Sequence, residues 1–118
     1  MPNYQTHLDS TFHALADPTR RAVIARLIEG PASVSELAEP FDMALPSLMQ
    51  HLKVLETGGL IRTQKTGRVR TCRLETERLG EAQDWLSKQK ALWETRLDRL
   101  DAYLRDMAAK ETSDDPQT

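Results

Sequence analysis

The chain has 118 residues, 39% of them hydrophobic and 29% charged, which fits one small soluble domain and leaves no room for a second. It carries 16 Lys and Arg and 18 Asp and Glu, a formal charge of -2, which excludes a protein that is basic throughout. The single cysteine excludes an internal disulfide and any zinc site built from several cysteines.

The N-terminal residues lack the basic and then apolar run of a signal peptide. No stretch approaches the roughly 18 consecutive apolar residues of a membrane helix. We therefore expect a cytoplasmic protein with no membrane partner.

Two helices are predicted in the first 30 residues. Apolar residues recur at helical spacing over residues 8–16, which predicts the first helix. Asp17 then offers an N-cap acceptor, and Pro18 suits the first position of a second helix. Gly30-Pro31 predicts where that helix ends.

A helix-turn-helix pair is predicted next. Ser33 and Glu36 have the spacing of a capping box and open a short helix that Pro40 must end. Leucines at 48, 52 and 55 then mark the buried side of a further helix, which the two glycines at 58 and 59 interrupt. Its start is poorly marked, because Ala44 and Leu45 are poor caps, although Pro46 tolerates only a first-turn position.

Residues 60–74 are rich in Ile, Val, Thr and Arg, which predicts a β-hairpin with Gly67 at the turn. Beyond it, leucines and other apolar residues recur with a spacing of seven, which predicts a helix of about 28 residues. We expect one domain over residues 1–110, with 75–110 as a long C-terminal helix used for dimerisation and 111–118 as a disordered tail. The tight apolar part of the heptad pattern, called the seam below, is Trp93, Leu97, Leu100, Leu104 and Met107.

Charge is unevenly distributed along the chain. Residues 1–44 and 74–118 carry net charges of -3 and -4, whereas residues 45–73 hold six basic side chains and one acidic one, a net +5. A basic block between acidic flanks is how a local nucleic-acid footprint coexists with a low overall charge. A solvated basic face is the alternative that composition alone leaves open.

The order of elements is that of a winged helix-turn-helix, a mainly α fold with a small β-hairpin, in which the second helix of the pair enters the DNA major groove. Gln50 can pair with an adenine edge, Met49 can contact a thymine methyl, and Lys53 suits a phosphate. The predicted DNA contacts are Pro46, Ser47, Met49, Gln50, Lys53, Arg62, Lys65, Arg68 and Arg70.

Three segments, residues 15–21, 35–38 and 50–61, resemble the ArsR/SmtB-type winged-helix transcriptional regulators, and the similarity covers about residues 8–74. The resemblance implies a homodimeric repressor that binds a near-palindromic double-stranded DNA operator and releases it when an effector binds. It also implies a dimer interface made by the first and last helices. The interface residues expected here are Leu8 and Phe12 together with the seam.

Metal-sensing members of that family carry paired cysteines before the recognition helix, where this chain has Ala38 and Pro40. No histidine follows His51 to complete the family's second metal site. We therefore expect no metal site, no cofactor and a regulator that does not respond to metal.

The effector stays open between a small organic molecule, oxidation of Cys72, a partner protein and changing protein abundance. Cys72 has arginines nearby in sequence, which favours a redox switch, whereas a half-buried strand residue is the plainer interpretation.

Two other function classes compete with this interpretation. An enzyme is not expected, because the sequence has no phosphate-binding glycine loop and no recognisable nucleophile–base arrangement. The stronger alternative is a winged-helix protein-interaction module that acts through its C-terminal helix.

Overall fold

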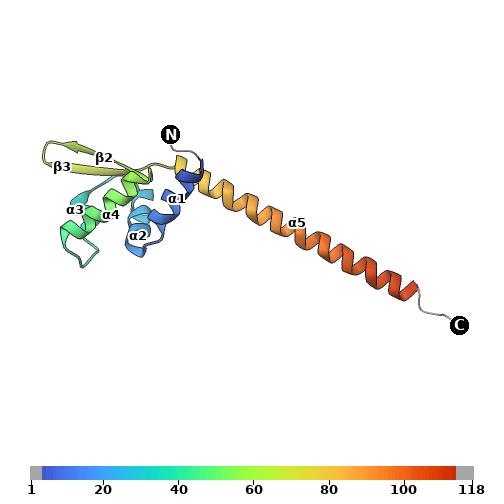
Figure 1. The fold of residues 1–118 in the computed structure, drawn as a ribbon. Coiled ribbons are helices and arrows are strands. Elements are labelled where there is room, and N and C mark those ends of the chain that lie inside the picture. Colours follow the sequence, from blue (N-terminus) through green and yellow to red (C-terminus); the bar gives the residue numbers. More distant parts are fainter. Residues whose placement is uncertain (1–3, 114–118) are drawn as a thin grey trace. The chain divides into compact units, whose positions relative to one another are not determined.

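The computed structural model describes residues 4–113 and divides the chain into two units, one up to Gln83 and a second from Asp84 (Figure 1). The expectation of a single domain over residues 1–110 remains a prediction. The first unit holds the helix-turn-helix core, and the second is a helical segment whose apolar side chains stay exposed. Within residues 4–113, none of the helices is both long enough and apolar enough to span a bilayer.

Helix α1 covers Tyr4–Leu15 and α2 covers Pro18–Ile28. Asp17 caps α2 as predicted, because its carboxylate accepts a hydrogen bond from the Arg20 amide at 3.1 Å. The short helix α3, Val34–Ala38, begins with the predicted capping box, in which Ser33 and Glu36 each accept a hydrogen bond from the other's amide. The amide and hydroxyl of Ser33 also hold the pKa of Glu36 below its ordinary value.

Helix α4, Leu45–Thr57, lies beside the hairpin of β2, Ile61–Thr66, and β3, Val69–Leu74 (Figure 1). Gly67 has a φ of 64° at the first position of the two-residue turn, which confirms the predicted hairpin and its turn. A third strand, β1 at Ala32–Ser33, pairs antiparallel with β3, so the sheet order is β1-β3-β2. The sequence prediction missed β1, because two residues are too few to show alternation.

The core of the first unit lies between the helices and the sheet. Its largest fully buried residues come from α2, α3, α4 and the hairpin region; they include Val23, Leu37, Leu48, Leu55, Leu60 and Cys72. The predicted leucine side of α4 is thus confirmed as core, which fixes which side of that helix is left exposed.

Helix α5, Glu77–Ser113, has 37 residues, which is longer than the 28 predicted from the heptad pattern but close to the bounds 75–110 expected for the C-terminal helix. Ion pairs four residues apart, Lys90–Glu94, Asp101–Arg105 and Asp106–Lys110, support a helix whose residues are mostly exposed. The helix runs through Ser113, so the tail predicted to begin at residue 111 is wrong for residues 111–113, while 114–118 lie outside the described residues.

Candidate DNA-binding surface

The exposed side of α4 carries most of the side chains predicted to touch DNA. Pro46, Ser47, Gln50 and Lys53 are exposed, while the leucines on the opposite side are buried. Met49 differs from the prediction, since it is half-buried and packs against the core. The N-cap Ala44 makes no side-chain hydrogen bond to the first turn, but its carbonyl accepts from the amides of Ser47 and Leu48 at 3.0 and 3.2 Å.

Arg20 joins the start of α2 to the end of α1 and to α4. Its Nε donates to the Ala14 carbonyl at 2.8 Å, and its Nη2 donates to the His13 carbonyl at 3.0 Å. Its Nη1 lies 3.1 Å from Nδ1 of His51, a residue of α4. Arg20 is therefore a cross-link that positions α4 against α1 and α2.

The contact between Arg20 and His51 fixes the role of the imidazole. A guanidinium can only donate, so His51 Nδ1 accepts and the ring proton lies on Nε2. Asp17 Oδ2 lies 3.8 Å from the same nitrogen. Burial alone would raise the pKa of Asp17, but hydrogen bonds from the Arg20 and Thr19 amides and the nearby Arg20 charge bring it below its ordinary value.

Three cations lie at the outer end of the hairpin, and we call Lys65, Arg68 and Arg70 the tip cations. Lys65 and Arg70 are directly opposite each other in the ladder, and Arg68 is in the turn. All three are exposed, and among the described residues none forms an ion pair. Like charges placed opposite each other weaken a hairpin, so this arrangement is suited to an external anion.

The base of the hairpin is electrostatically different. Arg62 and Arg73 are also opposite each other, but both reach the Glu75 carboxylate, at 3.3 and 3.6 Å. Arg62 was predicted as a DNA contact together with the tip cations. The ion pair with Glu75 compensates part of the charge of Arg62. The tip cations have no such ion pair within residues 4–113.

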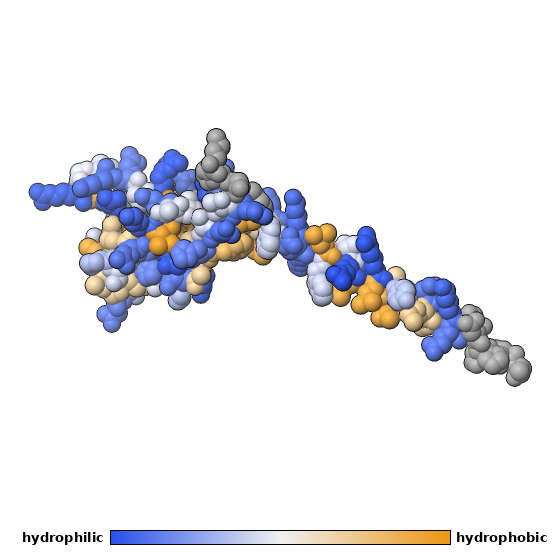
Figure 2. Space-filling model, in the orientation of Figure 1, coloured by the Kyte–Doolittle hydropathy of each residue, from blue (hydrophilic) through white to orange (hydrophobic). Residues whose placement is uncertain are grey.

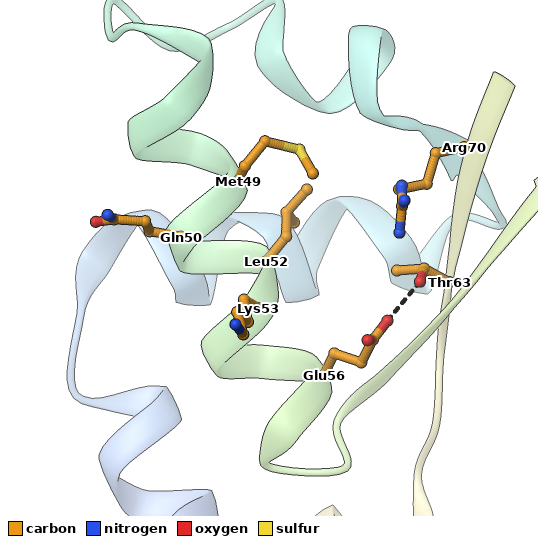
Figure 3. A pocket seen from close by; sticks show the side chains of 7 residues that line it. All are labelled: Met49, Gln50, Leu52, Lys53, Glu56, Thr63 and Arg70. Atoms are coloured by element: carbon orange, nitrogen blue, oxygen red, sulfur yellow. Dashed lines mark hydrogen bonds between the residues drawn. The ribbon is translucent and has the colours of Figure 1, made fainter. Parts of the chain in front are cut away.

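A groove of about 330 Å³ runs between α4 and the hairpin (Figure 3). Gln50 points away from the hairpin, whereas Arg70 reaches toward Met49 and Leu52 (Figure 3). At one end Thr63 Oγ1 donates a hydrogen bond to Glu56, which ties β2 to α4. Sequence reasoning missed this contact, although Glu56 is the single acidic residue in the basic block of residues 45–73.

Cys72 does not have the environment of a redox switch. It is fully buried in β3, opposite Ala32 of β1 and Thr63 of β2. Burial and the charge of Glu56 raise the pKa of its thiol, with Arg70 opposing them. A buried thiol with a raised pKa reacts slowly with oxidants, so the structure favours the plainer interpretation, in which Cys72 is a core residue of the strand.

The residues predicted for dimerisation fall into two groups. Leu8 has 7% exposure and is mostly covered within the single chain, and its place in the interface remains a prediction. Phe12, at 36%, keeps part of its ring exposed. In the second unit all five seam residues are exposed, and Figure 2 shows apolar side chains along this helix. Leu92 and Tyr103 add exposed apolar surface that the heptad pattern did not include.

No group of three or more His, Cys, Asp or Glu side chains is placed to hold a metal ion in the part of the chain that the structure describes.

Comparison with known proteins identifies the family. Residues 15–64 match HTH_20, a helix-turn-helix domain. The crystal structure of an ArsR family transcriptional regulator is 58% identical to this chain, with a TM-score of 0.75 over 80% of this chain and 97% of that protein. The chain belongs to the ArsR family of transcriptional regulators. The resemblance in sequence and the winged helix-turn-helix fold are thereby confirmed.

Two curated ArsR-like relatives add detail. The HTH-type transcriptional regulator Rv2034 of Mycobacterium tuberculosis is 43% identical over 67 residues, which are 57% of this chain and 63% of Rv2034. The transcriptional repressor SdpR of Bacillus subtilis is 29% identical over 79 residues, which are 67% of this chain and 88% of SdpR. The ArsR-family chain thus spans a little under two thirds of Rv2034 and most of SdpR.

Proposed function

We propose that this ArsR-family chain is a sequence-specific, DNA-binding repressor that acts as a homodimer in the cytoplasm. The observation that carries the proposal is the exposed side of α4 beside the tip cations. Gln50 presents a donor and an acceptor for a base edge, while the cations have no internal partner in the described residues and suit phosphates. Repression is the activity that the name of SdpR states for that relative.

In the proposed complex, α4 enters the major groove and the hairpin lies against the adjacent backbone or minor groove. Ser47 and Lys53 contact phosphates on one side of α4, and Gln50 contacts bases. The residues proposed to bind DNA are Pro46, Ser47, Met49, Gln50, Lys53, Lys65, Arg68 and Arg70, with a smaller contribution from Arg62.

The proposed homodimer is supported by the exposed seam. A soluble helix rarely leaves five large apolar residues on one stripe uncovered, and a second copy buries the same stripe with two-fold symmetry. Two-fold symmetry places two recognition helices on one duplex, so the operator is a near-palindrome. Its half-sites are separated by about one helical turn, roughly 34–36 Å, or a multiple of it.

The test is selection of bound duplexes from a random DNA pool, followed by fluorescence anisotropy titrations of the selected sequence and a scrambled one. We expect a palindromic consensus and a selected site bound about 10³-fold or more tightly than the scrambled one at the same salt. Equal affinity for both duplexes would contradict sequence-specific binding. No binding at low salt would favour the alternative, a protein-interaction module that acts through α5.

A further inference from the structure

A second groove, of about 450 Å³, lies between α1 and α4, on the side of α4 away from the hairpin groove. It has the size of a small-molecule site. The residues that line this α1–α4 groove are Ser10, His13, Gln50, Lys53, Val54, Thr57 and Gly58.

The close approach of α1 to the end of α4 builds this groove. A Cβ added at Gly58 would lie 3.3 Å from the Ser10 carbonyl oxygen and 3.3 Å from the Val54 carbonyl oxygen. Glycine therefore lets the two backbones meet there. Val54 is half-buried and packs against the core, which gives the groove an apolar wall held in place by the fold.

The chemistry of the lining favours an anion with an apolar body. Lys53 supplies an ammonium group, and Ser10, His13 and Gln50 supply groups that can donate hydrogen bonds. The described lining of this groove includes no carboxylate, whereas the hairpin groove includes Glu56. Donors and a cation around an apolar wall match a carboxylate attached to a small hydrocarbon group.

We propose that the α1–α4 groove binds a small organic carboxylate and that this ligand competes with DNA. Two of the lining residues, Gln50 and Lys53, also belong to the proposed DNA-binding surface. A carboxylate held there neutralises Lys53 and occupies the Gln50 amide, so it and the duplex exclude each other. The proposal that the groove binds a carboxylate depends only on the residues that line the groove. The proposal that this ligand competes with DNA rests on the proposed function.

The first experiment measures binding without DNA. The full chain is titrated with benzoate to about 20 mM and followed by amide NMR spectra, with benzamide as the uncharged probe of the same shape. We expect benzoate to shift resonances of Ser10, Val54 and Gly58 with a dissociation constant of about 1 mM, and benzamide to bind at least tenfold more weakly. Equal binding of both probes, no shifts, or shifts confined to other residues would overturn the site.

Variants on α1 locate the ligand. His13→Ala removes one donor but keeps the carbonyl that accepts from Arg20, so the fold is preserved. It should weaken benzoate binding about tenfold. Gln5→Ala, at an exposed α1 position outside the groove lining, is the matched control and should bind benzoate like the unchanged chain. If the His13→Ala chain bound benzoate as tightly as the unchanged chain, His13 would not contact the ligand, and the α1–α4 groove would not be its site.

The second experiment adds DNA at constant ionic strength, with chloride or benzamide in place of benzoate. At tenfold its dissociation constant, benzoate should raise the apparent dissociation constant of the homodimer for the operator about 100-fold, about tenfold for each of its two grooves, and less so for His13→Ala. Benzoate binding without any effect on DNA affinity would overturn competition. If His13→Ala bound DNA more weakly in the absence of benzoate, the groove would be a binding site for a DNA phosphate, and its assignment to an organic carboxylate would be overturned. Failure of all DNA binding would refute the proposed function while leaving the benzoate titration interpretable.

Discussion

Gln50 is exposed on α4 and points away from the hairpin, so its amide is presented to whatever α4 lies against (Figure 3). A side-chain amide can form two hydrogen bonds with the N6 and N7 atoms of adenine, and it matches no other base so well. Gln50 is therefore the residue at which sequence discrimination is most sharply testable.

Replacing Gln50 by Ala should cost about 1–3 kcal/mol of binding free energy at one base pair per half-site and leave non-specific binding nearly unchanged. Anisotropy titrations with the selected operator and with single-base variants measure this. Gln83→Ala, an exposed glutamine on α5, is the matched control and should leave discrimination intact. Equal weakening on every duplex would contradict base recognition by Gln50.

Asp17 has a stabilising role that should depend on pH. Its pKa is lower in the folded chain than its ordinary value of 3.8, so its charged form is favoured by folding. That contribution is present above the unfolded-state pKa and is lost as the pH falls through the folded-state pKa. Asp17→Asn keeps a good N-cap and removes only the charge.

Thermal unfolding should therefore show a lower Tm for Asp17→Asn than for the unchanged chain at pH 7, and the difference should shrink as the pH falls to about 3. Asp9→Asn, at an exposed position of α1, is the control for the loss of one negative charge. A Tm difference that stays constant over this pH range would show that the charge is not the cause.

At the scale of elements, the two ends of the hairpin differ in charge. At its base Glu75 pairs with two arginines, whereas the tip cations have no ion pair among the described residues. Arg68→Ala with Arg70→Ala should weaken binding to operator and scrambled DNA alike and reduce the salt slope by about two units. Arg62→Ala with Arg73→Ala removes the same charge from the pair that Glu75 holds, so its effect on the slope should be smaller. If the two double variants have the same effect, long-range charge rather than tip contact explains binding.

The elements that could be predicted from sequence are those whose local chemistry decides them. Asp17, the Ser33–Glu36 capping box and Gly67 each satisfy or bend the backbone within a few residues, so their effects are local. Strand β1 and the Thr63–Glu56 bond depend on residues brought together by folding, and the pattern along the chain contains no signal for them.

Side-chain roles in the candidate surface divide in the same way. The outward placement of Gln50 and Lys53 follows from helical periodicity, and the structure confirms it. Arg20 could not be assigned, because its partners come from α1 and from His51 of α4. The interface role of Leu8 remains a prediction, because a single stripe on a helix does not say whether the same chain or a second copy covers it.

At the scale of the whole molecule, the seam of α5 is expected to hold two copies together. Leu97→Asp should give monomers in analytical ultracentrifugation, because a carboxylate in the centre of an apolar interface has no partner. Leu97 is 43% exposed, so the substitution leaves the helix-turn-helix unit folded, which far-UV circular dichroism checks. Thr95→Asp places the same charge outside the seam and should leave dimers. Dimers that persist in Leu97→Asp would place the interface elsewhere.

Monomers should also bind the operator more weakly than dimers, because each half-site is then bound separately. An unchanged affinity for the full palindrome in Leu97→Asp would contradict cooperative binding by two copies.

The hydrogen bond from Thr63 to Glu56 has a consequence for the DNA itself. Because the bond ties β2 to α4, we expect the hairpin and α4 to approach the duplex together in the proposed complex, with the spacing between their contacts set by the protein. The width of the minor groove varies with base sequence, so base pairs that touch no side chain are expected to contribute to operator choice.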